Sequence, residues 1–414
     1  MTCHDRATYD ASLMVKISPH DPLVIRDGRP FSAGGEGANR ARSLDWPYPS
    51  TLSGAIRNLV GRVAASKGLV AGDPFRDADF LTRLKRLTIA GPLACKDECL
   101  YVTAPRDALA FEATRGPETT VEDHQGVSAN LEWVRLRPAE LDPGEGCDLP
   151  RAETLLPILA PRQEKPARMP AFWSMADTVE WLANDGEVTN VPGPRKVLEG
   201  FKKEERIHVR IDPQTQTADD SQLFSTQGLT FPDGTGLAAL AYTGDVTPVE
   251  MIGGLQTLHP LGGERRLAFF HFHTASSDWR VPDEIRSALS GATGVRMQLA
   301  TPAILSQGWL PGWLDPETLE GAPPGVSDTR LRLCSACVDR WRPVSGWDLE
   351  KRGPKPVRRV VPAGSVYFFE VVQGSAKDLA DCWLRPVADD EQDRRDGFGL
   401  ALWGVWRNKG GSAR

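Results

Sequence analysis

The sequence has no apolar run that approaches the roughly 18 residues needed to cross a bilayer, although 40% of its 414 residues are hydrophobic. The amino terminus, MTCHDRATYDASL, also has no apolar stretch of the kind found in secretory signals. These two absences argue against membrane insertion and secretion, so we expect a cytoplasmic protein that makes no membrane contact. Met14 is a second candidate for the native start.

A basic excess, which is usual in nucleic-acid-binding proteins, is missing too, because the formal net charge is −6. Any contact with nucleic acid must then depend on local patches. Cysteine is scarce and odd in number, with 7 residues scattered along the chain, which indicates reduced thiols rather than a disulfide framework. The length exceeds what one core usually supports, so two domains of roughly 150 to 200 residues are expected.

Hydrophobic spacing predicts several elements in the first quarter of the chain. Residues 13–18 (LMVKIS) are apolar and β-branched enough for a strand. From Pro49 onward apolar residues recur at helical spacing, and Ser50 or Thr51 is a candidate amino-terminal cap. Two apolar stretches joined by a charged turn predict a hairpin within residues 84–105.

The remainder mixes strands with few helices. Residues 206–212 alternate apolar and polar side chains, with residues 222–231 as a possible hairpin partner. Further strands are predicted at residues 236–243, 294–304 and 364–372 and after Gly397, and helices at residues 171–184, 284–289 and 376–383. Between about residues 108 and 194 the pattern is otherwise irregular. This mixture favours an α+β fold over a doubly wound parallel sheet.

Two sets of possible metal ligands have simpler interpretations. Cys334 with Cys337, and Cys95 with Cys99, could together supply four thiolates to zinc. Each pair lies in a strand-like segment rather than in a metal-binding knuckle, so buried free thiols are the simpler interpretation. His271 and His273 share one face of a predicted strand, where a solvated sheet face is favoured over a metal site.

Two other segments could contact RNA or catalyse its cleavage. His20 beside Asp21 could act as a general acid or base, or it could pair with a phosphate. The terminal GFGLALWG, with Gly397 and Gly399, lacks the following helix and the Gly-Lys-Ser/Thr ending of a phosphate loop. Its glycines permit close approach of the backbone either to a ligand or to a neighbouring domain.

Arginine-rich loops beside glycines occur in three places. Residues 340–359 hold seven Arg or Lys residues with Trp341 and Trp347 interleaved, the combination that binds phosphates and stacks bases of single-stranded nucleic acid. A solvated loop is the alternative for that segment. The second cluster contains Arg26, Arg29, Arg40, Arg42 and Arg57, and the third contains Arg265 and Arg266.

Motifs along most of the chain resemble those of a known family, the third RAMP subunit of the type III-B CRISPR (Cmr) effector complex. The matching segments are DPLVIRDGRPF, PSTLSGAIR, TAPRD, RIDPQTQTADDSQLF, LGGERR, SGWDL, PAGSVYFFEV and GFGLALWG. They follow one another in the expected order, whereas residues 1–13 have no obvious counterpart.

The resemblance implies two packed ferredoxin-like (RRM-like) domains, which we place at residues 14–195, with an irregular insertion at about 108–194, and residues 196–414. It also implies a non-catalytic subunit that binds the 5′ handle of the crRNA, the large polymerase-type subunit and the first backbone RAMP subunit. A metal-independent endoribonuclease that processes precursor crRNA through His20 is the alternative. The residues expected at the RNA are His20, Arg26, Arg29, Arg40, Arg42, Ser50, Thr51, Arg57, Arg265, Arg266, Lys355, Arg358, Gly397 and Gly399.

Overall fold

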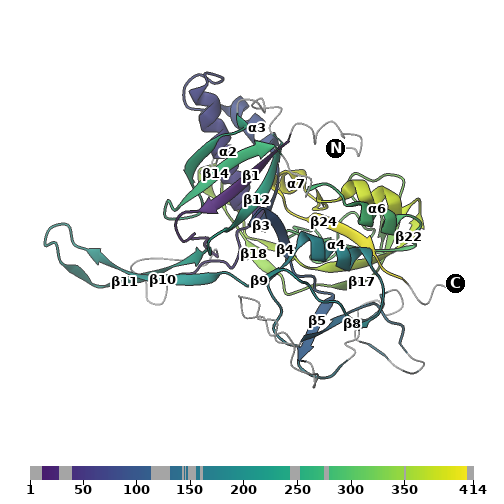
Figure 1. The fold of residues 1–414 in the computed structure, drawn as a ribbon. Coiled ribbons are helices and arrows are strands. Elements are labelled where there is room, and N and C mark those ends of the chain that lie inside the picture. Colours follow the sequence, from purple (N-terminus) through teal and green to yellow (C-terminus); the bar gives the residue numbers. More distant parts are fainter. Residues whose placement is uncertain are drawn as a thin grey trace.

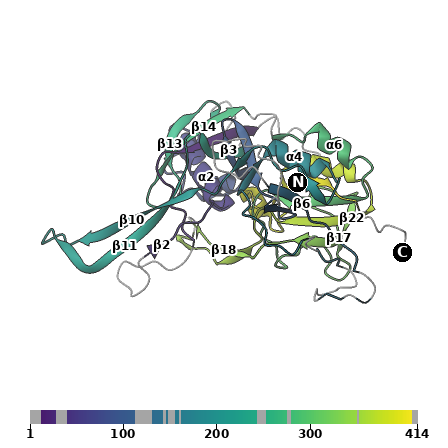
Figure 2. The same cartoon turned by 60° about the horizontal axis from the view of Figure 1, so that its bottom comes forward.

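Two large antiparallel sheets form the framework of the protein (Figures 1 and 2). The computed structural model describes residues 12–27, 40–112, 131–141, 144, 146–147, 155–158, 162–242, 252–274, 279–348 and 351–407. Sheets outweigh helices throughout these residues, which confirms the mixed composition predicted from the sequence. None of the helices in the described parts of the chain is long and apolar enough to cross a membrane.

The first sheet has eight strands in the order β13-β14-β1-β12-β3-β4-β7-β9. Their bounds are β1 Ser12–Pro19, β3 Thr88–Lys96, β4 Cys99–Thr103, β7 Phe172–Ser174, β9 Val197–Leu198, β12 Thr235–Tyr242, β13 Gln256–Pro260 and β14 Leu267–Thr274. The predicted strand at residues 13–18 and the predicted hairpin, β3 with β4, are therefore confirmed. Alternation in β1 sends Val15 and Ile17 to the core under the helices.

Helix α2 (Pro49–Ser66) covers one face of this sheet, and Leu52, Ile56 and Val60 join its core. The helix is where the sequence predicts it, but the predicted cap is wrong. Tyr48 is the N-cap and makes no side-chain cap bond, because Pro49, whose fixed φ suits the first helical position, starts the helix. Ser50 and Thr51 consequently lie within the first turn. A second helix, α3 (Ala78–Arg86), was not predicted.

The second sheet has six strands in the order β16-β17-β22-β15-β24-β23. Their bounds are β15 Gly294–Leu299, β16 Glu320–Gly321, β17 Arg330–Cys337, β22 Val366–Gln373, β23 Arg385–Pro386 and β24 Leu400–Val405. Helices α4 (Met175–Ala183) and α6 (Asp283–Leu289) and the 3-10 helix η2 (Ala376–Cys382) pack against β24. A short helix that was not predicted, α7 (Glu391–Asp396), contacts β3, α2 and α3 and so joins the two halves.

The predicted domain boundary between residues 195 and 196 does not separate the two sheets. Strands β12, β13 and β14 follow that boundary but belong to the first sheet, whereas α4 precedes it and packs on the second. Antiparallel pairing of β12 with both β1 and β3 joins segments that are more than a hundred residues apart in the chain. Such long-range pairing leaves no local signal in the sequence.

The predicted irregular segment at residues 108–194 contains regular structure. Strands β5 (Ala108–Glu112), β6 (Leu131–Arg135) and β8 (Thr189–Val191) form a small third sheet, and α4 confirms the helix predicted there. Strands of three to five residues are too short to show clear alternation.

A buried arginine cluster fixes this small sheet to the rest of the protein. Arg296 of β15 is fully buried and pairs with Asp107, with Nη1 2.8 Å from Oδ2. It also donates to the Asn184 carbonyl (3.0 Å) at the end of α4. The Arg135 guanidinium lies 4.2 Å from the Trp181 ring, and burial together with the charge of Arg296 lowers the pKa of Arg135 to about 9. We call Arg135, Arg137 and Arg296 the buried arginine cluster.

A long hairpin projects from the body of the protein (Figures 1 and 2). It consists of β10 (Lys202–Ile211) and β11 (Ala218–Thr230), and β2 (Arg40–Ala41) pairs in parallel with β11 at its base. The predicted strand pair is confirmed, yet the apolar face of the hairpin is exposed, with Ile207 76% and Leu223 59% accessible. Val209, paired with Leu223, is on the same face.

Candidate nucleic-acid interface

Three segments that the sequence marks as basic lie side by side near the base of the projecting hairpin. The turn of LGGERR is joined to the loop that follows β1, because Gly263 N donates to the Val24 carbonyl over 2.7 Å. The same loop is joined to the segment after residue 40, because Ile25 N donates to Ser43 Oγ over 3.1 Å. An isolated bridge between Arg26 and Ser43 adds to this contact. Arg26, Arg42 and Arg265 are exposed around these joints.

A basic hollow of about 410 Å³ opens between these segments. Its lining residues are Asp27, Arg40, Arg42, Ser43, Leu44, Asp45, Tyr48, Lys203, Gln227, Arg342 and Pro343. Four cationic side chains thus face two carboxylates, so the lining has an excess of positive charge. That excess attracts anions such as phosphates.

Asp45 neutralises part of the positive charge in the basic hollow. Its carboxylate lies 2.7 Å from Lys203 Nζ and 3.4 Å from Arg342 Nη1. Burial alone would raise the pKa of Asp45, but these two cations outweigh burial and lower the pKa below its usual value. Arg40 pairs with Glu205 at 2.7 Å across the hairpin base. Among the described residues, no hydrogen bond or ion pair engages the Arg42 guanidinium.

His20 is exposed at the end of β1, and its neighbour does not orient it. The Asp21 carboxylate accepts a hydrogen bond from Leu267 N (3.0 Å), and within the described chain no hydrogen bond joins it to the His20 imidazole. Arg266 is half-buried. Arg29 lies outside the described residues, so its predicted role stays a prediction.

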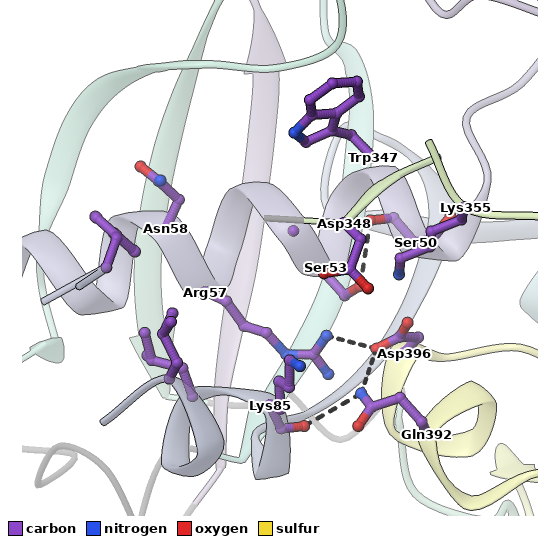
Figure 3. Close-up of a pocket in the computed structure, with 14 residues that line it drawn as sticks. Ser50, Ser53, Arg57, Asn58, Lys85, Trp347, Asp348, Lys355, Gln392 and Asp396 are labelled. Atoms are coloured by element: carbon purple, nitrogen blue, oxygen red, sulfur yellow. Dashed lines mark hydrogen bonds and ion pairs between the residues drawn. The ribbon is translucent and has the colours of Figure 1, made fainter. Parts of the chain in front are cut away.

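A second hollow, of about 270 Å³, adjoins the start of α2 (Figure 3). We call it the α2–α7 hollow. Its walls include Ser50, Arg57 and Asn58 of α2, Gln392 and Asp396 of α7, and Trp347 and Lys355 from the segment that follows β18 (Arg342–Val344). The hollow thus brings together the predicted residues Ser50, Arg57 and Lys355, whereas Thr51 does not line it.

The two hollows share two segments of the chain, because Tyr48 and Pro343 line the basic hollow, whereas Ser50 and Trp347 line the α2–α7 hollow. Tyr48 Oη joins the two segments by donating to the Pro343 carbonyl over 3.0 Å. Two short hairpins build this region from the predicted basic segment. They are β18 paired with β21 (Arg358–Val360) and β19 (Trp347–Asp348) paired with β20 (Gly353–Pro354). Residues on the hairpins therefore line both hollows, and most of the segment is exposed, so the choice between an RNA-binding and a solvated segment stays open.

Arg57 and Arg358, both predicted at the RNA, are held by internal carboxylates. The Arg57 side chain is only 12% exposed and binds Asp396 and the Leu87 carbonyl, so it fastens α2 to α7. Arg358 makes two hydrogen bonds of 2.7 Å to Asp393, whose side chain is buried. Burial raises the pKa of Asp393, and the Arg358 guanidinium opposes that rise. Both carboxylates are far from their arginines in the sequence, so the sequence alone did not indicate these pairs.

Gly397 and Gly399 are buried, and their predicted role at the RNA is corrected by their surroundings. Gly397 ends α7 with φ of +96°, and a Cβ there would lie 2.5 Å from the Ile89 carbonyl oxygen of β3. At Gly399 a Cβ would lie 2.9 Å from Ala388 N. Of the two readings of this loop, close approach to a neighbouring part of the protein is the one that the geometry supports.

The cysteine pairs and histidines that were considered as metal ligands are dispersed. Cys95 lies in the first sheet and Cys334 in the second, and burial raises the pKa of their thiols to about 11 and about 12. In the part of the chain that the structure describes, no three His, Cys, Asp or Glu side chains group as metal ligands. The rings of His271 and His273 lie 4.9 Å apart on the first sheet, both half-buried.

Lys203 and Tyr48 were missed by the sequence analysis. Lys203 is the second residue of β10, at the base of the hairpin, and donates to the Ser43 carbonyl (2.6 Å). Its only sequence signal is the charged run KKEER that starts the hairpin. Tyr48 is recognisable as a rim residue only once α2 is known to begin at Pro49.

The chain is similar to one protein family and to several solved structures. Residues 15–406 match the sequence model of the family described as CRISPR-associated protein (Cas_Cmr3). A chain of the type III-B Cmr-beta complex bound to cognate target RNA, solved by cryo-EM, is 15% identical, with 86% of each chain covered and a TM-score of 0.44. A chain of the Csm3-Csm4 subcomplex of the type III-A CRISPR-Cas interference complex is 10% identical, with 87% of this chain and 94% of that chain covered and a TM-score of 0.34. No curated protein matches.

Proposed function

We propose, from the premise that this chain belongs to the Cas_Cmr3 family of CRISPR-associated proteins, that it holds the 5′ handle of a crRNA within a type III-B effector complex of the cytoplasm. The observation that carries the proposal is the basic hollow, where four cations from three separate segments gather at the surface. Phosphates of a single strand pair with such cations, and adjacent aromatic rings stack its bases.

The proposal includes two ferredoxin-like domains. In the first sheet β14, β1, β12 and β3 stand in the order fourth, first, third, second along a βαββαβ unit. In the second sheet β24, β15, β22 and β17 stand in that same order. This repeated order supports a duplication of one unit, with a boundary after β14 instead of at residue 195.

The projecting hairpin supports a role in assembly. An isolated two-stranded ribbon is at best marginally stable in water, and exposed apolar side chains on one face favour a protein partner. Ile207, Val209 and Leu223 form such a face. We assign it to the docking of a backbone RAMP subunit, and the opposite end of the protein to the large polymerase-type subunit.

We further propose that the subunit works without turnover. The absence of a hydrogen bond between His20 and Asp21 within the described residues supports this, since a general base needs an orienting partner. Incubating the purified chain with precursor crRNA tests it. Clean cleavage that His20→Ala abolishes would restore the endoribonuclease alternative.

The RNA-holding role is tested by filter binding of the purified chain to the RNA that copurifies with it from its native host. If phosphate pairing dominates, the logarithm of the affinity falls with the logarithm of salt at a slope of about −0.7 for each neutralised phosphate. Salt-independent binding, or no RNA in the purified complex, would contradict the proposal.

A further inference from the structure

The α2–α7 hollow presents an indole ring that lacks an aromatic or cationic partner in the described parts of the chain. Trp347 is 60% exposed and belongs to the two-residue strand β19, where it pairs with Pro354. Figure 3 shows the ring above the helix, on the rim of the hollow. Bases stack on exposed aromatic side chains of this kind, and the stacking is tolerant of sequence because every base has a π face.

The size and polarity of the α2–α7 hollow fit one base. Its volume of about 270 Å³ lies just under the roughly 300 Å³ at which drug-sized pockets begin. The Asn58 Oδ1 accepts from Arg62, which leaves the amide hydrogens of Asn58 as donors. Gln392 Nε2 donates to Lys85 O and to Asp396 Oδ1, which leaves its carbonyl oxygen as an acceptor. Donors and an acceptor at fixed positions suit the edge of a base.

A cation stands at the rim of the α2–α7 hollow. Lys355 is half-buried there, and among the described residues no hydrogen bond or ion pair engages its ammonium group. Arg57, by contrast, is neutralised by Asp396 within the wall. The basic hollow adjoins the same two segments of the chain, since its lining residues Tyr48 and Pro343 lie two and four residues from Ser50 and Trp347 of the α2–α7 hollow.

We propose that the α2–α7 hollow takes one unstacked nucleotide of the bound RNA, with its base against the Trp347 indole and its phosphate beside Lys355. The inference rests on the proposed RNA-holding function and adds a position at which one base is extruded from the strand. A free mononucleotide also offers a base with a 5′ phosphate, and the experiment below distinguishes it from a nucleotide of the bound RNA.

Substitution of Trp347 tests the base contact in the full-length chain. Trp347→Leu should weaken binding of the copurifying RNA roughly 5- to 150-fold, the loss expected for one stacked base. Trp309→Leu is the control, because Trp309 is also exposed but lines neither hollow. That variant should change the affinity by less than about twofold. Both side chains are exposed, so folding should persist, and melting temperatures check this.

Photocrosslinking locates the nucleotide. The copurifying RNA is resynthesised with 5-iodouridine at one position at a time and irradiated with the protein, and mass spectrometry identifies the crosslinked peptide. One position, or two adjacent ones, should crosslink at Trp347. Excess AMP should not displace the RNA or protect Trp347, whereas protection by AMP would make a free nucleotide the occupant and overturn the inference.

The outcomes separate this inference from the function on which it rests. RNA that binds equally well to Trp347→Leu, with no crosslink at Trp347, overturns the base site and leaves the RNA-holding function standing. Failure of the unsubstituted chain to bind RNA overturns both.

Discussion

The buried arginine cluster and the basic hollow use the same side chain in opposite ways. In the cluster, Arg296 is fully buried and is matched by Asp107 and by carbonyl groups at the end of α4. At the hollow, Arg42 is exposed, and the cations lining the hollow outnumber the carboxylates. Arginine content alone therefore says little about RNA binding. What separates the two regions is whether the protein itself supplies the anion.

The largest effect is expected where the anion of the buried cluster is removed. Asp107→Ala leaves the Arg296 charge buried without its partner, which costs about 3 to 5 kcal/mol for a buried pair. Urea denaturation should show the loss as a lower midpoint. Asp381→Ala is the control, because its pair with Arg286 is exposed and should contribute about 1 kcal/mol or less. Equal effects of the two substitutions would break the comparison.

A smaller effect is expected at Arg358, which the sequence assigned to RNA and the structure assigns to Asp393. Arg358→Gln removes two charge-assisted hydrogen bonds from a buried carboxylate and should cost about 1 to 3 kcal/mol of stability. The affinity for RNA should stay within about twofold, as measured by filter binding. A large loss of affinity at unchanged stability would return Arg358 to the RNA-binding residues.

The smallest effect on stability is expected at Asp45, within the basic hollow. Asp45→Asn removes a carboxylate that competes with phosphates, so RNA affinity should rise, while stability falls by about 1 kcal/mol or less because the pairs are exposed. The lowered pKa of Asp45 means that its pairs stabilise the fold above the unfolded value of 3.8 and lose that contribution as pH falls through the folded value. The stability difference between the two proteins should therefore vanish in acid. A difference that persists there, or weaker RNA binding, would contradict this role.

Elements with strong periodicity were predictable from the sequence. Helix α2 carries apolar residues at helical spacing along its 18 residues, and β10 alternates apolar and polar side chains from residue 206 to its end. Helix α3 was missed because it is only nine residues long, ADFLTRLKR, with four of them charged and only Phe80 and Leu84 buried. The hairpin also shows what alternation cannot predict. The pattern identified a strand, but it did not show that the apolar face of that strand is exposed.

The candidate site was only partly predictable, because residues far away in the sequence determine which arginines are paired inside the protein and which are exposed. Arg42 and Arg57 occur within one cluster in the sequence, yet Asp396, the partner of Arg57, lies far along the chain. The same holds for Gly397, whose neighbour is the backbone of β3. The sequence shows which loops are rich in arginine. It does not show that α7 packs against α2 and β3, and this packing is what buries Arg57 and Gly397.

By this proposal the exposed arginines of the basic hollow, rather than arginines in general, hold RNA through its phosphates. The most direct test is the salt dependence of RNA binding for the unsubstituted chain, for Arg42→Gln with Arg342→Gln, and for Arg358→Gln. Each phosphate contact contributes about 0.7 to the logarithmic slope, so the double variant should lose about 1.4 from the slope and Arg358→Gln should lose nothing. Equal slopes for all three proteins would contradict the account.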